Sequence, residues 1–250
     1  MSGHSKWAQI KRAKGANDVK RGQAFTKLGR EITMAAREGG GSPDGNARLR
    51  LAIDRARAAN MAMDTIQRAI ARGTGGGDGA NLEEITYEAY GPGGVAILIA
   101  ATTDNRNRTV AELRAALTRG GGSLGEAGSV AWNFESRGVL LVEAAKGQDP
   151  EELALQAIDA GADDFNVEDH EVELLTEPAK LEDVRAALER SGVAVTSAEV
   201  SMVAKTTVDV PPDQAAQVMR LVERLEDLDD VSDVHTNLNL TDEAMAQLAS

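Results

Sequence analysis

The chain has 250 residues, of which 42% are hydrophobic and 27% charged, as in folded globular proteins. It contains no cysteine, which excludes disulfides and thiolate metal sites and fits a reducing cytosol. No apolar run approaches the roughly 18 residues of a membrane helix, and none follows the basic N-terminal residues as in a signal peptide. We therefore expect a cytoplasmic protein with no membrane partner.

The charge is divided unevenly along the chain. The formal net charge is -13, yet residues 1–80 hold 15 Lys and Arg against 7 Asp and Glu, a balance of +8. The remaining residues hold 12 basic and 33 acidic side chains, a balance of -21. Such a split indicates a part that binds a polyanion, joined to an acidic part. A basic face that is merely solvated is the alternative.

The first 80 residues predict an arm and a three-helix bundle. Residues 1–15 show no helical period and form the arm. A helix is expected from residue 17 or 18 to residue 38, with an apolar stripe of Phe25, Leu28, Ile32 and Ala35. The segment "SPDGNARLRLAIDRARAAN" predicts a second helix that buries Leu49, Ala52, Ile53 and Ala56. The segment "MDTIQRAIARG" predicts a third, with Ile66, Ala69 and Ile70 inward and Gly73 as its C-cap.

After the glycine-rich linker "GTGGGDGAN" the pattern changes to strands. "EEITYEAYG" alternates as a half-buried strand, and "GGVAILIAATTD" is apolar throughout, as in a central strand. A capped helix over "NRTVAELRAALTRGGG" and a strand over "GSVAWNF" follow. The next elements are strand 138–144, helix 150–160, strands 164–168 and 171–176, helix 178–191 and strand 194–203. Their order, βαββαβ, is that of the ferredoxin-like fold.

The last elements are a strand over "AKTTVDV", a helix from Pro211-Pro212 to about Leu228, and a strand over "SDVHTNLNL". Because the elements at 84–120 lack two strands and a helix, we expect the C-terminal elements to supply them. The predicted fold is therefore α+β, with a three-helix bundle followed by two α/β domains, the last a ferredoxin-like domain inserted into the middle one. The predicted boundaries are 1–80 for the bundle, 81–135 with 205–250 for the middle domain, and 136–204 for the acidic insertion.

No catalytic constellation is present in the sequence. His4, His170 and His235 lack metal-ligand spacing, and the acidic surroundings of the last two indicate exposed side chains. Neither "GTGGGDGAN" nor "GPGGVA" is followed by the Lys-Ser/Thr and helix of a phosphate-binding loop. We expect no enzymatic activity, no cofactor and no metal.

Basic side chains around one aromatic residue predict a nucleic-acid site. Trp7 lies between Lys6 and the Lys11-Arg12 pair, so it can stack on an exposed base, or instead anchor the arm on its own bundle. Lys20, Lys27 and Arg30 fall broadly on one side of the first helix, where a row of cations would follow a phosphate backbone. The predicted nucleic-acid-binding residues are His4, Lys6, Trp7, Lys11, Arg12, Lys14, Lys20, Arg21, Lys27, Arg30, Arg106 and Arg108.

Arg106 and Arg108 belong to this set because they lie in the polar segment "TDNRNRT", whose charges could join the same surface. They also stand at the start of a helix, where cations oppose the helix dipole. Because this placement is unfavourable, it slightly favours a role in binding over the alternative that both arginines are solvent-exposed charges without a role.

Several motifs resemble the YebC/PmpR family. They are "MSGHSKW" at the start, "NARLRLAIDRARAANM" with "MDTIQRAIARG", "TYEAYGPGG", "TDNRNRT", "GGSLGEAGSVAWNF" and "DAGADD", in order from about residue 2 to 240. Ala62 and Ala100 depart from the proline and glutamate usual in the family. The resemblance implies three domains and no enzymatic activity. Family members have been labelled probable DNA-binding transcriptional regulators, whereas others, including a mitochondrial translational activator, resemble ribosome-associated factors that assist elongation.

The leading prediction is a ribosome-associated translation factor whose basic part binds rRNA or tRNA and assists elongation at stalls such as proline-rich stretches. The alternative is a DNA-binding transcriptional regulator, for which the sequence shows no zipper or evident dimer helix. A protein partner that binds the acidic domains is compatible with either. A hydrolase or nuclease is disfavoured by the lack of clustered metal ligands.

Overall fold

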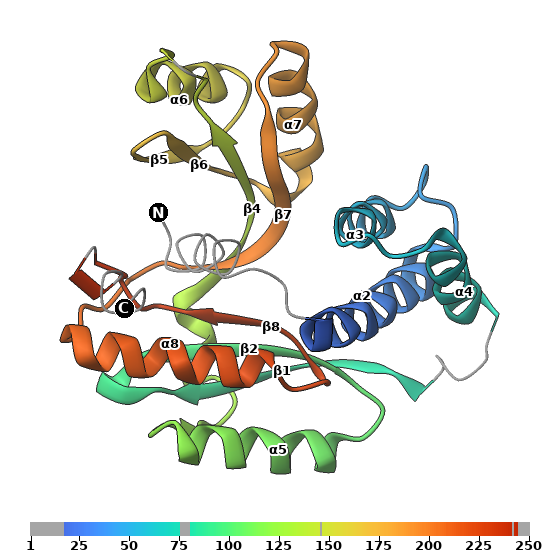
Figure 1. Cartoon of the computed structure of the whole chain (residues 1–250), viewed down its shortest axis with the longest axis vertical. Coiled ribbons are helices and arrows are strands. Elements are labelled where there is room, and N and C mark those ends of the chain that lie inside the picture. Colours follow the sequence, from blue (N-terminus) through green and yellow to red (C-terminus); the bar gives the residue numbers. More distant parts are fainter. Residues whose placement is uncertain (1–17, 76–80, 146, 242, 245–250) are drawn as a thin grey trace. The chain divides into compact units, whose positions relative to one another are not determined.

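A computed structural model of the chain describes residues 18–75, 81–145, 147–241 and 243–244 (Figure 1). These residues divide into two compact units. One contains 18–131 and Val210–Thr236, and the other contains Trp132–Asp209 and Asn237–Leu240. In the described ranges no helix combines the length and the apolar character needed to cross a membrane.

The first unit begins with three helices, α2 (Asp18–Gly39), α3 (Ala47–Ala58) and α4 (Met63–Thr74). The predicted apolar stripes meet in one core. Ile32 and Ala35 are buried with Phe25 and Leu28 packed against them, and the buried residues of α3 are Leu49, Ala52, Ile53 and Ala56, as predicted. Asn46 caps α3 by accepting from the Leu49 amide at 3.0 Å, and its amide group donates to the Ala35 carbonyl at 2.8 Å.

Gly73 has a different role from the predicted one. The C-cap of α4 is Gly75, whereas Gly73 lies inside the helix. A Cβ at Gly73 would stand 2.3 Å from the backbone oxygen of Thr33 and 2.9 Å from the Cβ of Ala36. The glycine is therefore required because α2 and α4 approach each other closely at this point.

The change Gly73→Ala is expected to destabilise the first unit by about 1–3 kcal/mol, because the added methyl group forces the two backbones apart. Gly29→Ala in α2 is the matched control, since nothing lies within 4 Å of its Cβ position. That control should be neutral or stabilising by up to about 1 kcal/mol, the helix-propensity gain of alanine over glycine. Urea unfolding of both variants measures the difference, and equal midpoints would contradict the close-packing explanation.

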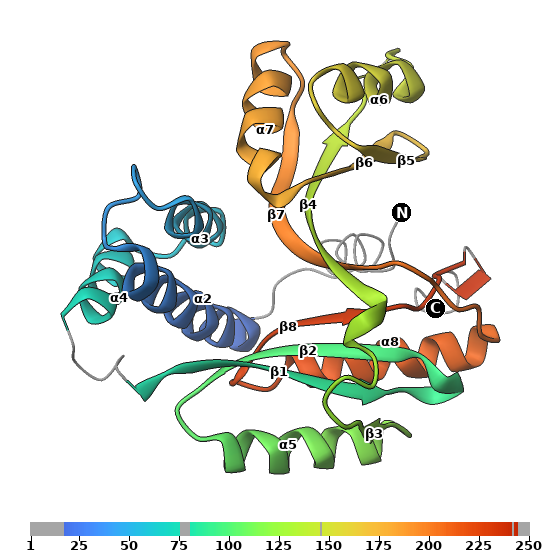
Figure 2. The ribbon, with the colours of Figure 1, turned by 180° about the vertical axis from the view of Figure 1, so that it is seen from behind.

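The first sheet has the strand order β3-β1-β2-β8 and is antiparallel throughout. Its strands are β1 (Glu83–Tyr90), β2 (Ala96–Thr103), β3 (Ser123–Leu124) and β8 (Val231–Thr236). The helices α5 (Arg106–Arg119) and α8 (Pro212–Glu226) pack beside each other, and α8 covers one face of the sheet (Figures 1 and 2). Apolar residues along β2 are buried, as its sequence predicts for a central strand.

Two strand predictions were wrong. Residues 128–134 form no strand apart from Phe134. Three of their backbone amides donate to the side chain of Glu88, and Ala131–Asn133 form a short 3₁₀-helix. Of residues 204–210, Ala204 ends the preceding strand and the rest make only an isolated bridge, from Val208 to Leu238. The C-terminal segment therefore supplies one strand and one helix to the first sheet, and the local strand β3 completes it.

The second unit contains the predicted βαββαβ arrangement. Its elements are β4 (Phe134–Glu143), α6 (Pro150–Asp159), β5 (Asp164–Glu168), β6 (Glu171–Thr176), α7 (Leu181–Arg190) and β7 (Val195–Ala204). The strand order β5-β6-β4-β7, antiparallel throughout, is that of a ferredoxin-like sheet. Because the chain leaves the first sheet after β3 and returns to it at β8, the predicted α+β fold with an inserted domain is confirmed. The exact domain boundaries stay a prediction.

Candidate nucleic-acid interface

The predicted binding residues fall into three groups in the structure. The arm residues His4, Lys6, Trp7, Lys11, Arg12 and Lys14 lie outside the described residues. Lys20 and Arg21 belong to α2, but their side chains are also outside the description. Lys27, Arg30, Arg106 and Arg108 are described in full, and all four contact oxygen atoms of this chain.

Lys27 and Arg30 attach α2 to the end of α8, to the residues just after it and to β2. The Lys27 ammonium donates to the backbone oxygen of Glu226, and Arg30 donates to the backbone oxygens of Asp229 at 2.8 Å and Thr102 at 3.1 Å. Carbonyls at the C-terminal end of a helix lack intrahelical partners, and cations there are favourable to the helix dipole. These two side chains therefore join the bundle to the first sheet, so they do not form a free row of cations. Whether they also bind nucleic acid stays a prediction.

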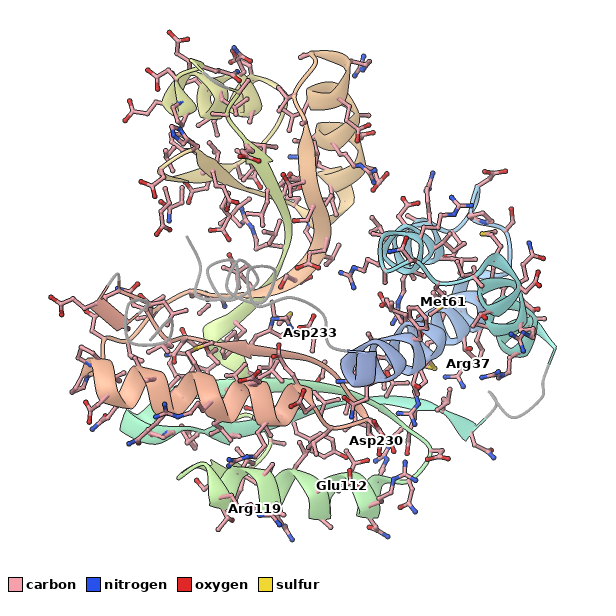
Figure 3. The ribbon with its side chains drawn as sticks, in the orientation of Figure 1. Arg37, Met61, Glu112, Arg119, Asp230 and Asp233 are labelled. Carbon is pink, nitrogen blue, oxygen red and sulfur yellow. The ribbon has the colours of Figure 1, made fainter. Side chains whose placement is uncertain are left out.

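Asp230 is the buried charge at which these contacts converge. Its side chain is only 2% exposed, and Figure 3 shows it near the end at which α5 begins. Its carboxylate accepts from Arg30 at 2.9 Å, from Arg108 at 2.8 and 2.9 Å, and from the hydroxyls of Thr109 at 2.8 Å and Thr103 at 3.1 Å. Burial alone would raise the pKa of Asp230, but these hydrogen bonds outweigh it and lower that pKa.

Arg106 and Arg108 at the start of α5 have carboxylate partners that offset the unfavourable dipole. Arg106 donates to both carboxylate oxygens of Glu83, at 2.7 and 2.5 Å, and Arg108 donates to Asp104 at 2.8 Å as well as to Asp230. The hydrogen bond from Arg106 lowers the pKa of Glu83, and the hydrogen bond to Asp230 raises the pKa of Arg108. The structure thus gives both arginines a structural role. Their predicted role in nucleic-acid binding is neither supported nor opposed.

Glu88 holds a loop that the sequence pattern did not reveal. This side chain in β1 accepts from the backbone amides of Gly128 at 2.6 Å, Val130 at 2.6 Å and Ala131 at 2.8 Å. Burial would raise the pKa of Glu88, and the three amide hydrogen bonds instead lower it. The loop leads directly to Trp132, whose side chain is 69% exposed. The sequence contains no signal for this arrangement, because Glu88 stands at a polar position of the β1 alternation, where an exposed side chain is expected.

The change Glu88→Gln is expected to destabilise the chain by about 1–2 kcal/mol, because a neutral amide cannot accept all three backbone hydrogen bonds and loses their charge assistance. Hydrogen exchange at the amides of Gly128, Val130 and Ala131 should accelerate, which NMR measures residue by residue. The control is Glu126→Gln in the same loop, whose side chain is exposed. Unchanged exchange in the Glu88 variant would refute this role of the carboxylate.

The two histidines in the described ranges differ in burial. His170 is exposed, as predicted, but the prediction for His235 was wrong. His235 is 4% exposed because it lies in β8 paired with Leu98 of β2. Throughout the ranges that the structure describes, no group of three or more His, Asp and Glu side chains is placed to hold a metal ion.

These observations define an α+β protein in which N-terminal helices precede two sheet-containing domains. The N-terminal domain of TACO1/YebC proteins matches residues 5–76, and the second and third domains of TACO1/YebC match residues 82–238. The chain belongs to the TACO1/YebC family, which confirms the resemblance seen in its motifs.

Similar proteins cover the chain over almost its whole length. A probable transcriptional regulatory protein of Moorella thermoacetica is 58% identical over 250 residues, which is 99% of both chains. One of Roseiflexus castenholzii, with the same description, is 57% identical over 254 residues and 100% of both chains. The crystal structure of a conserved hypothetical protein from Aquifex aeolicus superimposes with a TM-score of 0.81 at 42% identity, covering 90% of this chain and 93% of that one.

Proposed function

We propose that this protein is a non-enzymatic regulator of gene expression that acts by binding the sugar-phosphate backbone of nucleic acid. The observation that carries the proposal is the charge split, +8 over residues 1–80 in a chain of net charge -13. An acidic protein repels nucleic acid in general, so a local excess of cations directs binding to one part of its surface. The names of the relatives, probable transcriptional regulatory proteins, agree with a regulatory role.

DNA is the first candidate partner. Transcriptional regulation, the role in the relatives' names, requires contact with DNA, directly or through a partner protein. Backbone contacts by lysine and arginine position a protein on a duplex without reading its sequence. DNA-binding specificity would then come from DNA shape or from a second protein.

The ribosome is the second candidate, and a specific feature favours it. Trp7 stands among cations in the basic arm, and Trp132 exposes 69% of its side chain. Exposed aromatic side chains stack on unpaired bases, which are common in RNA and rare in duplex DNA. A translation factor bound to rRNA or tRNA would use such side chains directly. In either case the acidic inserted domain is free to bind a protein partner.

The partner is identified by crosslinking the tagged chain to nucleic acid in cells and sequencing the bound RNA and DNA separately. Enrichment of rRNA or tRNA, with co-sedimentation on ribosomes, would establish the translation role. Enrichment of discrete DNA segments would establish the transcriptional role. If both fractions match those of an untagged control, the proposed function is wrong.

A further inference from the structure

An open cleft of about 260 Å³ lies between the C-terminal end of α5 and the outward face of α8, within the first unit. Three arginines line it: Arg119, the last residue of α5, and Arg220 and Arg224 on α8. Gln217 also faces the cleft, and no Asp or Glu belongs to its lining. Figure 3 shows Arg119 on α5, toward the opposite end of that helix from Asp230.

The three arginines differ from those at the start of α5. Arg106 and Arg108 pair with carboxylates, whereas within the described part of the chain Arg119, Arg220 and Arg224 form no ion pair or hydrogen bond. Arg220 and Arg224 are also four residues apart on one helix face, where like charges repel each other by a few tenths of a kcal/mol. Three cations therefore lie together in an acidic chain, and no carboxylate of the described residues pairs with them.

Helix dipoles account for only part of this arrangement. Arg119 and Arg224 lie in the last turns of their helices, where a positive charge is favourable. Arg220 lies more than one turn before the end of α8, beyond the range of that effect. A ligand with negative charge explains all three positions.

Two glycines after α5 allow the C-terminal end of that helix to pack closely against α8. A Cβ at Gly120 would stand 2.6 Å from Leu221 Cδ1, and a Cβ at Gly122 would stand 2.5 Å from the backbone oxygen of Tyr90. Glycine at both positions therefore lets the end of α5 rest directly on Leu221 of α8. The amides of Gly120 and Gly122 donate to the Leu117 carbonyl, so the end of α5 is capped without the Arg119 side chain.

We propose that this cleft binds a phosphate group of a nucleic-acid backbone, as a contact additional to that of the basic N-terminal residues. The guanidinium group donates two parallel hydrogen bonds to phosphate oxygens, so the arginines and the amide of Gln217 supply more than enough donors for the two unesterified oxygens of one phosphodiester. The proposal rests on the proposed function, and it extends the nucleic-acid surface to the first sheet-containing domain. The sequence does not predict these side chains as nucleic-acid contacts, since arginines on an amphipathic helix usually indicate a solvated face.

The test compares the double variant Arg220→Gln/Arg224→Gln with the matched double variant Arg185→Gln/Arg190→Gln, which removes two arginines from α7. Binding is measured by fluorescence anisotropy with a labelled 20-nucleotide single-stranded RNA and a labelled 20-base-pair DNA, from 50 to 200 mM salt. The cleft variant should bind its preferred probe about 5- to 20-fold more weakly at 100 mM salt. Its log-log salt dependence should be shallower by roughly 0.7 to 0.9, the value for the one phosphate contact that the cleft makes. The α7 variant should bind as wild type does.

Three outcomes would overturn the cleft proposal. Equal binding by the cleft variant and wild type, with weakened binding by the arm variant described below, would overturn the cleft proposal and leave the proposed function intact. Equal losses in the cleft and α7 variants would also overturn it, because they would reflect net charge alone. If wild type binds neither probe, the proposed function fails and the cleft proposal fails with it. Thermal melting of both variants confirms that they are folded.

Discussion

Reversing four charges in the basic arm, with Lys6, Lys11, Arg12 and Lys14 changed to Glu, is expected to weaken nucleic-acid binding by about 100-fold or more at 100 mM salt. Each lost phosphate contact removes counterion release, and each new carboxylate adds repulsion. Anisotropy with the RNA and DNA probes measures the loss. The melting temperature should not change, because the arm belongs to neither predicted core.

A matched pair of double variants controls for net charge. Lys11→Glu/Arg12→Glu and Lys180→Glu/Arg190→Glu each replace one lysine and one arginine, so they change the charge equally. The double variant in the arm should lose at least about tenfold in affinity for nucleic acid. The double variant in the inserted domain should lose less than about threefold. Similar losses in both would show that overall charge controls binding and that the arm has no particular role.

Asp230→Asn is expected to lower the free energy of unfolding by about 2–3 kcal/mol. The change removes the buried charge to which Arg30 and Arg108 both donate, and it leaves Arg108 only its more exposed partner Asp104. Arg108 is 42% exposed, so water screens part of the loss. The control is Asp229→Asn, whose side chain is exposed and whose backbone oxygen, the acceptor for Arg30, is unaltered. Equal urea midpoints for the two variants would contradict the role given to Asp230.

The same carboxylate makes stability depend on pH. The pKa of Asp230 is lower in the folded chain than in the unfolded chain, where it is about 4. Its contribution is therefore fully present above about pH 4 and is lost as the pH falls through the lower folded-state value. Wild type should lose stability steeply below pH 4, and Asp230→Asn should do so less steeply. Urea midpoints between pH 3 and 7 measure both slopes, and parallel slopes would be inconsistent with this linkage.

Local pattern was sufficient to predict most of the fold. The apolar spacing of α3 predicts its four buried residues because a helix with one apolar face has a single way to bury it. The βαββαβ order likewise follows from alternation between strands and capped helices. Gly73 was misassigned because a glycine near a helix end serves equally as a cap or as a point of close approach, and only the neighbouring helix distinguishes these.

The polar contacts could not be predicted, since their partners are distant in sequence. Asp230 receives Arg30 from 200 residues away and Thr109 from 121 residues away. Glu88 likewise binds amides about 40 residues further along the chain. In the sequence, Arg30 and Arg108 are indistinguishable from cations free to bind phosphate. The arginine cleft could not be predicted for the same reason, because its members lie on two helices about a hundred residues apart.

The most direct test of the central claim is the salt dependence of nucleic-acid binding by the intact chain. If the basic N-terminal residues bind the backbone through about five cations, these contacts should contribute roughly -3.5 to -4.5 to the slope of the logarithm of the association constant against the logarithm of salt concentration, and the cleft adds one further contact. That result, with the slope reduced in the arm variant, would establish electrostatic backbone binding. A slope near zero for both RNA and DNA, or no binding of either at 50 mM salt, would contradict it.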